Sequence, residues 1–270
     1  MPHSLIIHLF PQQNMPVEST KGNKLHGLLF NLISQLDPQK AAILHNESAK
    51  VFTASHLFYP HDQNTTISAG TNCRVRYTLL QDDLLSLFYQ AFLDQHPKLH
   101  LDNVEIAVTN LQTSGTPLEW SCSQSYEALY QNAPDQHEIT IRFFSPTAFK
   151  IGKKNSLFPS PERLFQSWLD RWCLFSGIPI SLNLPELTND FLYVAKYELK
   201  TRSIKYTMSP FVGFLGECTY QLSDKLPEQT VRELNLLANF SYYCGTGIKT
   251  TMGMGQTACI HQGQAPSWKD

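Results

Sequence analysis

Residues 137–177, HEITIRFFSPTAFKIGKKNSLFPSPERLFQSWLDRWCLFSG, set the order of elements from which the fold is predicted. Apolar and polar residues alternate between His137 and Phe144, which is typical of a β-strand with one buried face. From Ser160 onward, apolar residues recur at every third or fourth position up to Phe175, and Gly177 then ends this predicted helix. The second half of the chain therefore begins with a strand followed by a helix.

The rest of the chain contains the same two kinds of segment. In the second half, a predicted helix begins at Pro227, and strands are predicted at 191–208, 211–222 and 255–260. In the first half, strands are predicted at 3–10, 52–59, 74–80 and 103–111, and helices at 25–36, 38–44 and 82–95. Apart from the short helix at 38–44, each half follows the order strand, helix, strand, strand, helix, strand. This order predicts an α+β fold of two tandem ferredoxin-like (βαββαβ, RRM-like) modules.

The two modules are predicted at residues 1–120 and 135–270, because the segment 115–135 is rich in Ser, Gln, Pro and Thr, as loops are. The halves share no visible sequence identity, so the repeat is one of pattern. Apolar runs stay well short of the roughly 20 residues that cross a bilayer. Residues 1–10 lack the basic start and the small-residue cleavage site of a signal peptide, so no membrane partner is expected.

Composition is that of a globular protein. The chain has 270 residues, of which 42% are hydrophobic and 16% are charged. This apolar content excludes intrinsic disorder and is ample for a packed core. The six cysteines are scattered and form no Cys-x-x-Cys pair, which favours reduced, mostly buried thiols in the cytoplasm over a disulfide framework.

Basic residues are concentrated in one part of the chain. Between Ile141 and Lys205 there are ten Lys or Arg residues and five Asp or Glu residues, a net charge of +5. The remaining residues carry 11 basic and 18 acidic side chains, and the whole chain has a net charge of −2. A basic stretch on an otherwise acidic protein predicts a surface for a polyanion. A solvated face on which cations cluster by chance is the alternative interpretation.

A glycine-rich segment, YCGTGIKTTMGMGQ at residues 243–256, follows the last predicted helix. Its four glycines lie within eleven residues, which allows positive φ angles and a close approach of backbone N–H groups to another chain. The segment leaves a helix instead of entering one, which excludes a P-loop and a dinucleotide-binding fingerprint. A tight loop packed on the second sheet is the alternative to a binding loop.

Several motifs together resemble the CRISPR-associated endoribonucleases of the Cas6 family, in the RAMP superfamily. They are the glycine segment with Thr250 or Thr251 before Gly253-Met254-Gly255, the segment Phe211–Gly216, the run from Leu157 to Trp172, and the stretch from Leu44-His45-Asn46 to Ser55. The likeness covers nearly the whole chain. It implies two ferredoxin-like modules, in agreement with the order of elements.

The resemblance also implies an activity. Members of this family cleave CRISPR repeat RNA in precursor transcripts to give mature guide RNAs, without a metal or another cofactor. The ribose 2′-OH attacks the neighbouring phosphorus, which leaves a 2′,3′-cyclic phosphate and a 5′-OH. The expected partner is therefore CRISPR repeat RNA, with other CRISPR effector-complex subunits as further candidates and no DNA, in a prokaryotic cytoplasm. A non-catalytic RNA-binding RAMP subunit of an effector complex is the alternative function, and an unrelated two-module scaffold is a third.

This chemistry needs a base, an acid and a cation, and histidine titrates near neutrality. By its motif, His45 resembles the catalytic histidine of the family, and Lys50 follows where the family often has a lysine that holds the phosphate. His26, in the first turn of the predicted helix 25–36, is the second candidate. Near it, where the family has an aromatic partner, stand Phe30 and Asn31, which have no phenol. A helix-terminal or exposed histidine remains the alternative for His26 and His45.

The residues predicted to contact RNA come from the basic stretch and from the glycine segment. A strand places every second side chain on one face, so even positions between 196 and 202 predict a row of cations with Lys205 at its end. The predicted set is Lys150, Lys153, Lys154, Lys196, Lys200, Arg202, Lys205, Gly245, Gly247, Lys249, Gly253 and Gly255.

No metal site is expected. The pairs His56/His61 and His96/His100 have spacings that suit metal ligation, but no third ligand accompanies either pair at motif spacing. No Gly-x-Ser-x-Gly elbow of a serine hydrolase occurs in the chain either.

Overall fold

The computed structural model describes residues 1–47, 49–60, 65–91, 98–205 and 210–267. These residues form two compact units. The N-terminal unit contains Pro2–Ser123 together with Thr251–Gly253 and Ser267, and the C-terminal unit contains Gln124–Thr250 and Met254–Pro266. The division after Ser123 lies inside the segment 115–135. Residues 251–253 belong to the N-terminal unit although they lie in the second half of the sequence. The predicted division into two contiguous modules does not include this feature.

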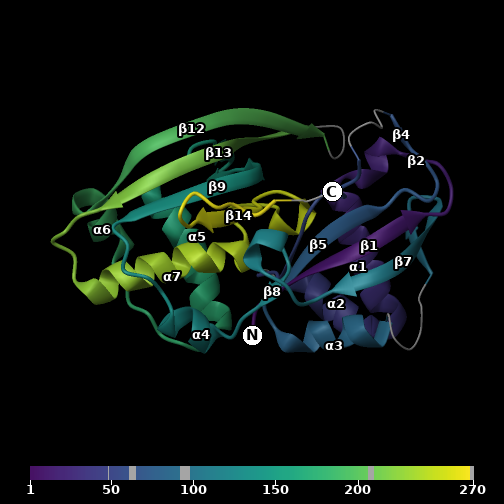
Figure 1. The fold of residues 1–270 in the computed structure, drawn as a ribbon, viewed down its shortest axis with the longest axis horizontal. Helices are drawn as coiled ribbons and strands as arrows, with labels where there is room; N and C mark the ends of the chain where they lie inside the picture. The colour runs from purple at the N-terminus through teal and green to yellow at the C-terminus, as the bar shows by residue number, and fades with distance from the viewer. Residues whose placement is uncertain (48, 61–64, 92–97, 206–209, 268–270) are drawn as a thin grey trace. The chain divides into compact units, whose positions relative to one another are not determined.

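In the N-terminal unit, an antiparallel sheet has the strand order β3-β5-β1-β7-β6, and β8 also pairs with β1 (Figure 1). The strands are β1 (His3–Pro11), β3 (Phe52–Ala54), β5 (Cys73–Leu79), β6 (Leu99–Leu101), β7 (Val104–Gln112) and β8 (Cys122–Ser123). The helices are α1 (Gly22–Leu36), α2 (Pro38–Asn46) and α3 (Asp82–Gln90). Two short strands, β2 (Met15–Pro16) and β4 (Thr66–Ile67), pair separately, and 3₁₀ turns cover Val17–Thr20 and Pro117–Glu119.

In the C-terminal unit, a four-stranded antiparallel sheet has the order β12-β13-β9-β14. Its strands are β9 (Glu138–Thr147), β12 (Leu192–Lys205), β13 (Pro210–Leu222) and β14 (Thr257–Ile260). The helices are α4 (Tyr126–Gln131), α5 (Pro161–Phe175), α6 (Leu184–Asp190) and α7 (Glu228–Cys244). A 3₁₀ turn covers Thr250–Met252, and its last two residues belong to the N-terminal unit. A hairpin of β10 (Phe149–Ile151) and β11 (Lys154–Ser156) follows β9. Figure 1 shows α5 and α7 against one face of the sheet.

The two sheets confirm the predicted fold class. If the four main strands of each unit are numbered along the chain, both sheets have the order second, third, first, fourth. Two helices, one after the first and one after the third of these strands, complete the βαββαβ pattern in each unit. The apolar stripe of α1, with Leu25, Leu29 and Ile33, is fully buried, as its helical period predicts.

Some predicted elements differ in extent. Strand β3 ends at Ala54 instead of residue 59, although Phe58 forms an isolated bridge with Arg74. The end of the predicted helix 82–95 and the end of the predicted strand 191–208 lie outside the described residues. The sequence does not predict β6, α4, the β10–β11 hairpin or α6, nor the two-residue strands and the 3₁₀ turns. No described helix is long and apolar enough to cross a membrane.

Candidate functional site

Two consecutive helices of the N-terminal unit bring the candidate histidines together. His26 and Phe30 lie one turn apart on α1, and their ring centroids are 4.8 Å apart. Helix α2 begins at Pro38, where the Asp37 side chain accepts a hydrogen bond from the Lys40 N–H at 2.9 Å, and its last turn contains His45. The Phe30 and His45 rings meet edge to face, with centroids 5.7 Å apart. Phe30 therefore contacts both imidazoles.

Phe52, the first residue of β3, contacts both His26 and Phe30. Phe52 is fully buried, and its ring stacks on His26 with centroids 5.7 Å apart and planes 29° apart. The same ring contacts Phe30 at 5.8 Å. Two aromatic rings thus contact the imidazole of His26, which is half-buried, while His45 is exposed to solvent.

Lys50 lies at the carboxyl end of α2. Its Nζ donates hydrogen bonds to the backbone oxygens of Leu44 at 2.8 Å and of His45 at 2.7 Å. The last carbonyls of a helix have no partner within the helix and carry partial negative charge, so an ammonium group here is favourable. The lysine therefore fixes the end of the helix that carries His45 and brings a positive charge to the cluster.

The electrostatic surroundings of His26 favour its neutral form. Burial lowers the pKa of His26, a backbone group of Thr251 opposes this change, and the charges of Lys50 and His45 lower the pKa further. Its Nδ1 atom is buried and has no hydrogen-bond partner among the described residues. An imidazole in this state can accept a proton near neutral pH.

The tip of the glycine segment packs against the start of α1, within the N-terminal unit. A Cβ atom on Gly22 would lie 2.1 Å from the Met252 oxygen, so only glycine fits where α1 begins. His56 Nδ1 accepts a hydrogen bond from the Gly22 N–H at 3.0 Å. Gly253 has a φ of +85°, and a Cβ atom there would lie 2.7 Å from His56 Nε2. His56 thus holds both the first turn of α1 and the loop tip that approaches His26.

The other glycines of the segment are explained by packing within the C-terminal unit. Gly247 and Gly255 have φ angles of +74° and +69°, and a Cβ atom on them would lie 2.3 Å from the Ala148 oxygen and 2.1 Å from the Thr246 oxygen. Backbone hydrogen bonds join Thr246 N–H to the Gly255 oxygen at 2.9 Å and Ile248 N–H to the Ala148 oxygen at 3.0 Å. RNA contact at Gly245, Gly247, Gly253 and Gly255 remains a prediction.

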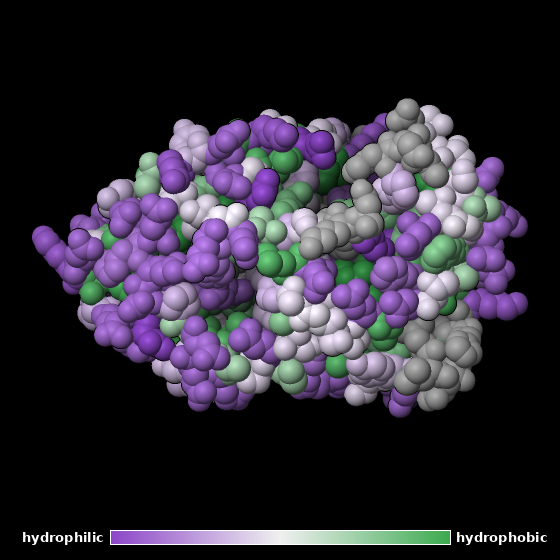
Figure 2. Space-filling model, viewed as in Figure 1, coloured by the Kyte–Doolittle hydropathy of each residue, from purple (hydrophilic) through white to green (hydrophobic). Residues whose placement is uncertain are grey.

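The predicted basic residues lie on three surfaces of the C-terminal unit. Lys150, Lys153 and Lys154 are exposed on the β10–β11 hairpin, which turns at Gly152 with a φ of +54°. Lys249 lies over the Phe211 ring, with Nζ 4.3 Å from its centroid. The third surface is β12, the region where Figure 2 shows many hydrophilic side chains.

The predicted row of cations on β12 contains an acidic residue, and Lys205 does not belong to it. Lys196, Lys200 and Arg202 pair with Thr219, Leu215 and Gly213 and lie on one face of the sheet. Glu198 lies in the same row, opposite Glu217. Lys205 is at an odd position in an unshifted part of the ladder, so its side chain belongs to the opposite face.

Two residues of the site were missed at the sequence level. Phe52 belongs to a buried strand, where an aromatic residue is ordinary, and its place in the motif stretch from Leu44 to Ser55 was the one signal for it. His56 was considered only as a metal ligand with His61, and His61 and His96 lie outside the described residues. Among the described residues, no three His, Cys, Asp or Glu side chains are grouped so that they could hold a metal ion.

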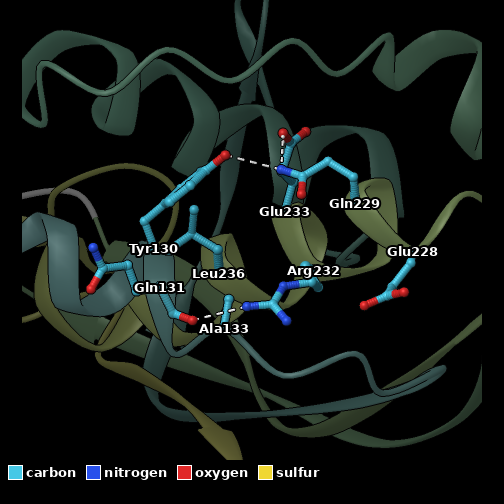
Figure 3. A pocket seen from close by; sticks show the side chains of 8 residues that line it. All are labelled: Tyr130, Gln131, Ala133, Glu228, Gln229, Arg232, Glu233 and Leu236. Atoms are coloured by element: carbon cyan, nitrogen blue, oxygen red, sulfur yellow. Dashed lines mark hydrogen bonds between the residues drawn. The ribbon is translucent and has the colours of Figure 1, made fainter.

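A cavity of about 400 Å³ lies between α4 and the first turns of α7, and it contains none of the predicted site residues (Figure 3). Its polar groups bond to one another. Gln229 donates to the Tyr130 hydroxyl at 3.0 Å and to Glu233 at 2.9 Å, and Arg232 donates to the Gln131 oxygen at 2.9 Å. These bonds indicate that the side chains close the junction of two helices.

Comparison with known proteins gives consistent results for both halves. Residues 141–257 match the family described as CRISPR-associated endoribonuclease Cas6, and residues 1–131 match the CRISPR Cas6 N-terminal domain. The CRISPR-associated endoribonuclease Cas6 of Streptococcus thermophilus is 25% identical over 243 residues, which cover 86% of this chain and 88% of that protein.

Solved structures agree over nearly the whole chain. A Cas6 product complex is 28% identical and has a TM-score of 0.82, with 96% of this chain and 100% of that chain covered. Thermus thermophilus Cas6 is 27% identical, with a TM-score of 0.73 and coverage of 96% and 98%. With both halves matched, the chain belongs to the Cas6 family of CRISPR-associated endoribonucleases.

Proposed function

We propose that this protein cleaves CRISPR repeat RNA in precursor transcripts and releases mature guide RNAs. The observation that carries the proposal is that His26 and His45 both contact Phe30 while Lys50 bonds to the backbone oxygen of His45. Cleavage by transesterification requires a base for the ribose 2′-OH, an acid for the leaving 5′-oxygen and a cation for the phosphorane. The cluster contains one group suited to each requirement.

His26 is assigned as the base and His45 as the acid. Burial lowers the pKa of His26, so this imidazole is ready to accept the 2′-OH proton. The 2′-oxygen then bonds to phosphorus, the bond from phosphorus to the 5′-oxygen breaks, and His45 gives a proton to that oxygen. The products are a 2′,3′-cyclic phosphate and a 5′-OH. His45 is exposed and His26 is half-buried, so solvent reaches both residues.

Lys50 is assigned to the extra negative charge of the phosphorane. It also positions His45, because its ammonium bonds to the backbone oxygen of that residue. Since the base, acid and cation are all side chains, the proposed reaction needs neither a metal nor another cofactor. The repeat RNA is proposed to lie along the basic surfaces of the C-terminal unit, where three lysines of the β10–β11 hairpin are exposed.

The test is cleavage of a repeat RNA in the presence of EDTA. Wild-type protein is expected to cut, and a 2′-deoxy substitution at the scissile nucleotide is expected to stop cleavage. His26→Ala and His45→Ala should each slow single-turnover cleavage by about 10²–10⁴-fold while RNA affinity is kept. His100→Ala is the matched control, because His100 is an exposed histidine on β6 of the same unit.

Two outcomes would contradict the proposal. Cleavage that stops in EDTA would show that the reaction needs a metal. Tight binding of repeat RNA without any cleavage would instead support the alternative function, a non-catalytic RNA-binding subunit of a CRISPR effector complex.

A further inference from the structure

Two aromatic side chains form a pair on the surface of the C-terminal unit. The rings of Phe158 and Tyr197 meet edge to face, with centroids 5.5 Å apart and planes 84° apart. Phe158 is 40% exposed and Tyr197 is 61% exposed. Large apolar rings lose stabilisation when they remain in water, so a paired and exposed set of this kind is a candidate contact surface.

The backbone of β12 determines which face carries this pair. Tyr197 is opposite the buried Cys218, so its ring lies on the sheet face against which α5 packs. A bulge between Val194 and Lys196 shifts the register, and Tyr193 therefore lies on the opposite face, opposite Gln221. Because β12 is an edge strand, the Tyr197 ring can be approached from beyond the sheet.

The charge beside the pair is positive. Phe158 follows β11 by two residues, and the segment 149–158 contains three exposed lysines and no acidic residue. Phe158 is four positions after Lys154, so their Cα atoms are at most about 14 Å apart. A ligand with one planar apolar group and nearby negative charges fits this arrangement. An unpaired nucleotide has both, since every base offers a π face and every step of the strand has a phosphate.

We propose that Phe158 and Tyr197 form a stacking site for an unpaired nucleobase of single-stranded RNA whose phosphates lie along the lysines of the β10–β11 hairpin. The inference rests on the proposed function in one respect, since the protein must bind RNA. It adds a binding site for the base itself, whereas the hairpin lysines would contact only the phosphates of the RNA. The site discriminates single strands from duplexes, because paired and stacked bases cannot enter it.

The experiment compares two fluorescein-labelled RNAs by anisotropy. One is a single-stranded oligoadenylate of fifteen nucleotides, and the other has the same sugars and phosphates without bases. Tyr197→Leu and Phe158→Leu are expected to weaken binding of the oligoadenylate by roughly 5- to 150-fold per stacked base. Binding of the abasic RNA should stay unchanged in both variants.

The control is Tyr89→Leu, which removes a ring that is 39% exposed on α3, outside the set of residues predicted to contact RNA. It should bind both RNAs as the wild type does. Equal losses in all three variants, no loss in any, or equal weakening of abasic and oligoadenylate binding would overturn the stacking site. A changed sedimentation coefficient with unchanged RNA affinity would also overturn it, in favour of contact with a second copy of the chain.

Repeat-RNA cleavage measured on the same preparations separates this inference from the proposed function. If the wild type cuts repeat RNA and the aromatic variants bind oligoadenylate normally, only the stacking site is wrong. If the variants lose base-dependent binding while the wild type cuts no repeat RNA, the stacking site stands without the nuclease. Urea unfolding of each variant checks that the exposed positions tolerate leucine.

Discussion

Phe30 contacts the two histidines of the candidate site and has no polar atom to offer either of them. A phenol at this position could donate a proton or hold a phosphate, whereas a phenyl ring can only pack and exclude water. This packing contributes to the burial that lowers the pKa of His26. The proton transfers proposed above therefore fall to the imidazoles.

The rate of cleavage should report the titration of His26. Its pKa lies below the usual 6.5, so the active neutral form is lost only when the pH falls below that value. We expect the logarithm of the single-turnover rate to decline on the acid side, with its break below pH 6.5. His26→Asn should remove this acid limb from the residual activity. A wild-type rate whose acid-side decline begins above pH 6.5 would contradict the assignment of His26 as the base.

The same shift affects stability. The unfolded chain takes up a proton on His26 before the folded protein does, so the free energy of unfolding should fall as the pH falls through 6.5. His3 and His261, whose pKa values burial also lowers, act in the same direction. The measurement is therefore a difference, namely urea unfolding of wild type and of His26→Asn at about pH 7.5 and about pH 5.5. The variant should lose less stability over this range, and an equal loss would contradict the prediction.

Lys50 should affect both activity and the end of α2. Lys50→Met keeps the apolar stem but removes the charge and the donors that bond to Leu44 and His45. We expect cleavage at saturating RNA to slow by about 10²-fold. Urea unfolding should show a loss of about 1 kcal/mol, since a cation at a helix end is stabilising. Lys98→Met, at an exposed lysine of the same unit, is the control, and wild-type cleavage by Lys50→Met would exclude its role.

A motif marks His45 and Lys50 in the sequence, and a predicted helix contains His26. The structure brings these three residues close together, and their roles in cleavage stay predictions. The lowered pKa of His26 could not be predicted, because it depends first on burial of the ring and then on an opposing backbone group of Thr251, near the other end of the chain.

Among the elements, the first turn of α1 depends on a segment that is remote in sequence. Gly253→Ala should lower the free energy of unfolding for two reasons. The φ angle is positive at this position, and the new methyl group would clash with the His56 ring. Gly70→Ala is the matched control, with a φ of +75° and no atom within 4 Å of the new Cβ. The control should lose about 1–2 kcal/mol from strain alone. Gly253→Ala should lose about 1–3 kcal/mol more, measured by urea unfolding, and equal losses would contradict the packing argument.

His56 should matter through the acceptor that it offers to α1. His56→Asn can keep an oxygen near the position of Nδ1, whereas His56→Leu leaves the Gly22 N–H without this bond. We expect His56→Leu to slow cleavage at saturating RNA and His56→Asn to restore most of the rate. If both variants cut alike, the hydrogen bond has no part in positioning the site.

Long elements were predictable and short ones were not. Helices α1, α5 and α7 have an apolar period over fifteen or more residues, which fixes both their type and their buried face. Helix α4 has six residues, and besides its Ser125 cap it depends on contacts of the Tyr126 ring with Trp172 and Phe240. The bulge in β12 left no mark in the sequence, although it moves Tyr193 to the face opposite Tyr197.

For the whole molecule, charge distribution matters more than net charge. The chain has a net charge of −2, but the segment 149–158 contains three lysines and no acidic residue. If these lysines contact phosphates, replacing all three by alanine should reduce the slope of log affinity against log salt by about 2. Lys98→Ala and Lys225→Ala, at exposed lysines outside the predicted set, should leave the slope unchanged. An unaltered slope in the triple variant would exclude the hairpin as a phosphate contact.

The tandem architecture was predictable because each half repeats one order of elements, and such an order admits few topologies. The assignment of residues 251–253 to the N-terminal unit was not predictable, because a sequence pattern can only divide the chain into contiguous segments.

The position of residues 251–253 limits which chimaeric proteins can fold. Recombination after Ser123, where the main segment of the N-terminal unit ends, would replace the second half together with Thr251–Gly253, which belong to that unit. The donor segment would then have to accommodate a foreign Gly22 and His56, at spacings that leave no room for a methyl group. Functional chimaeras should therefore be rare unless both parents have the same backbone geometry at residues 251–253. We expect substitutions at Gly22, His56 and Gly253 to be coupled in evolution.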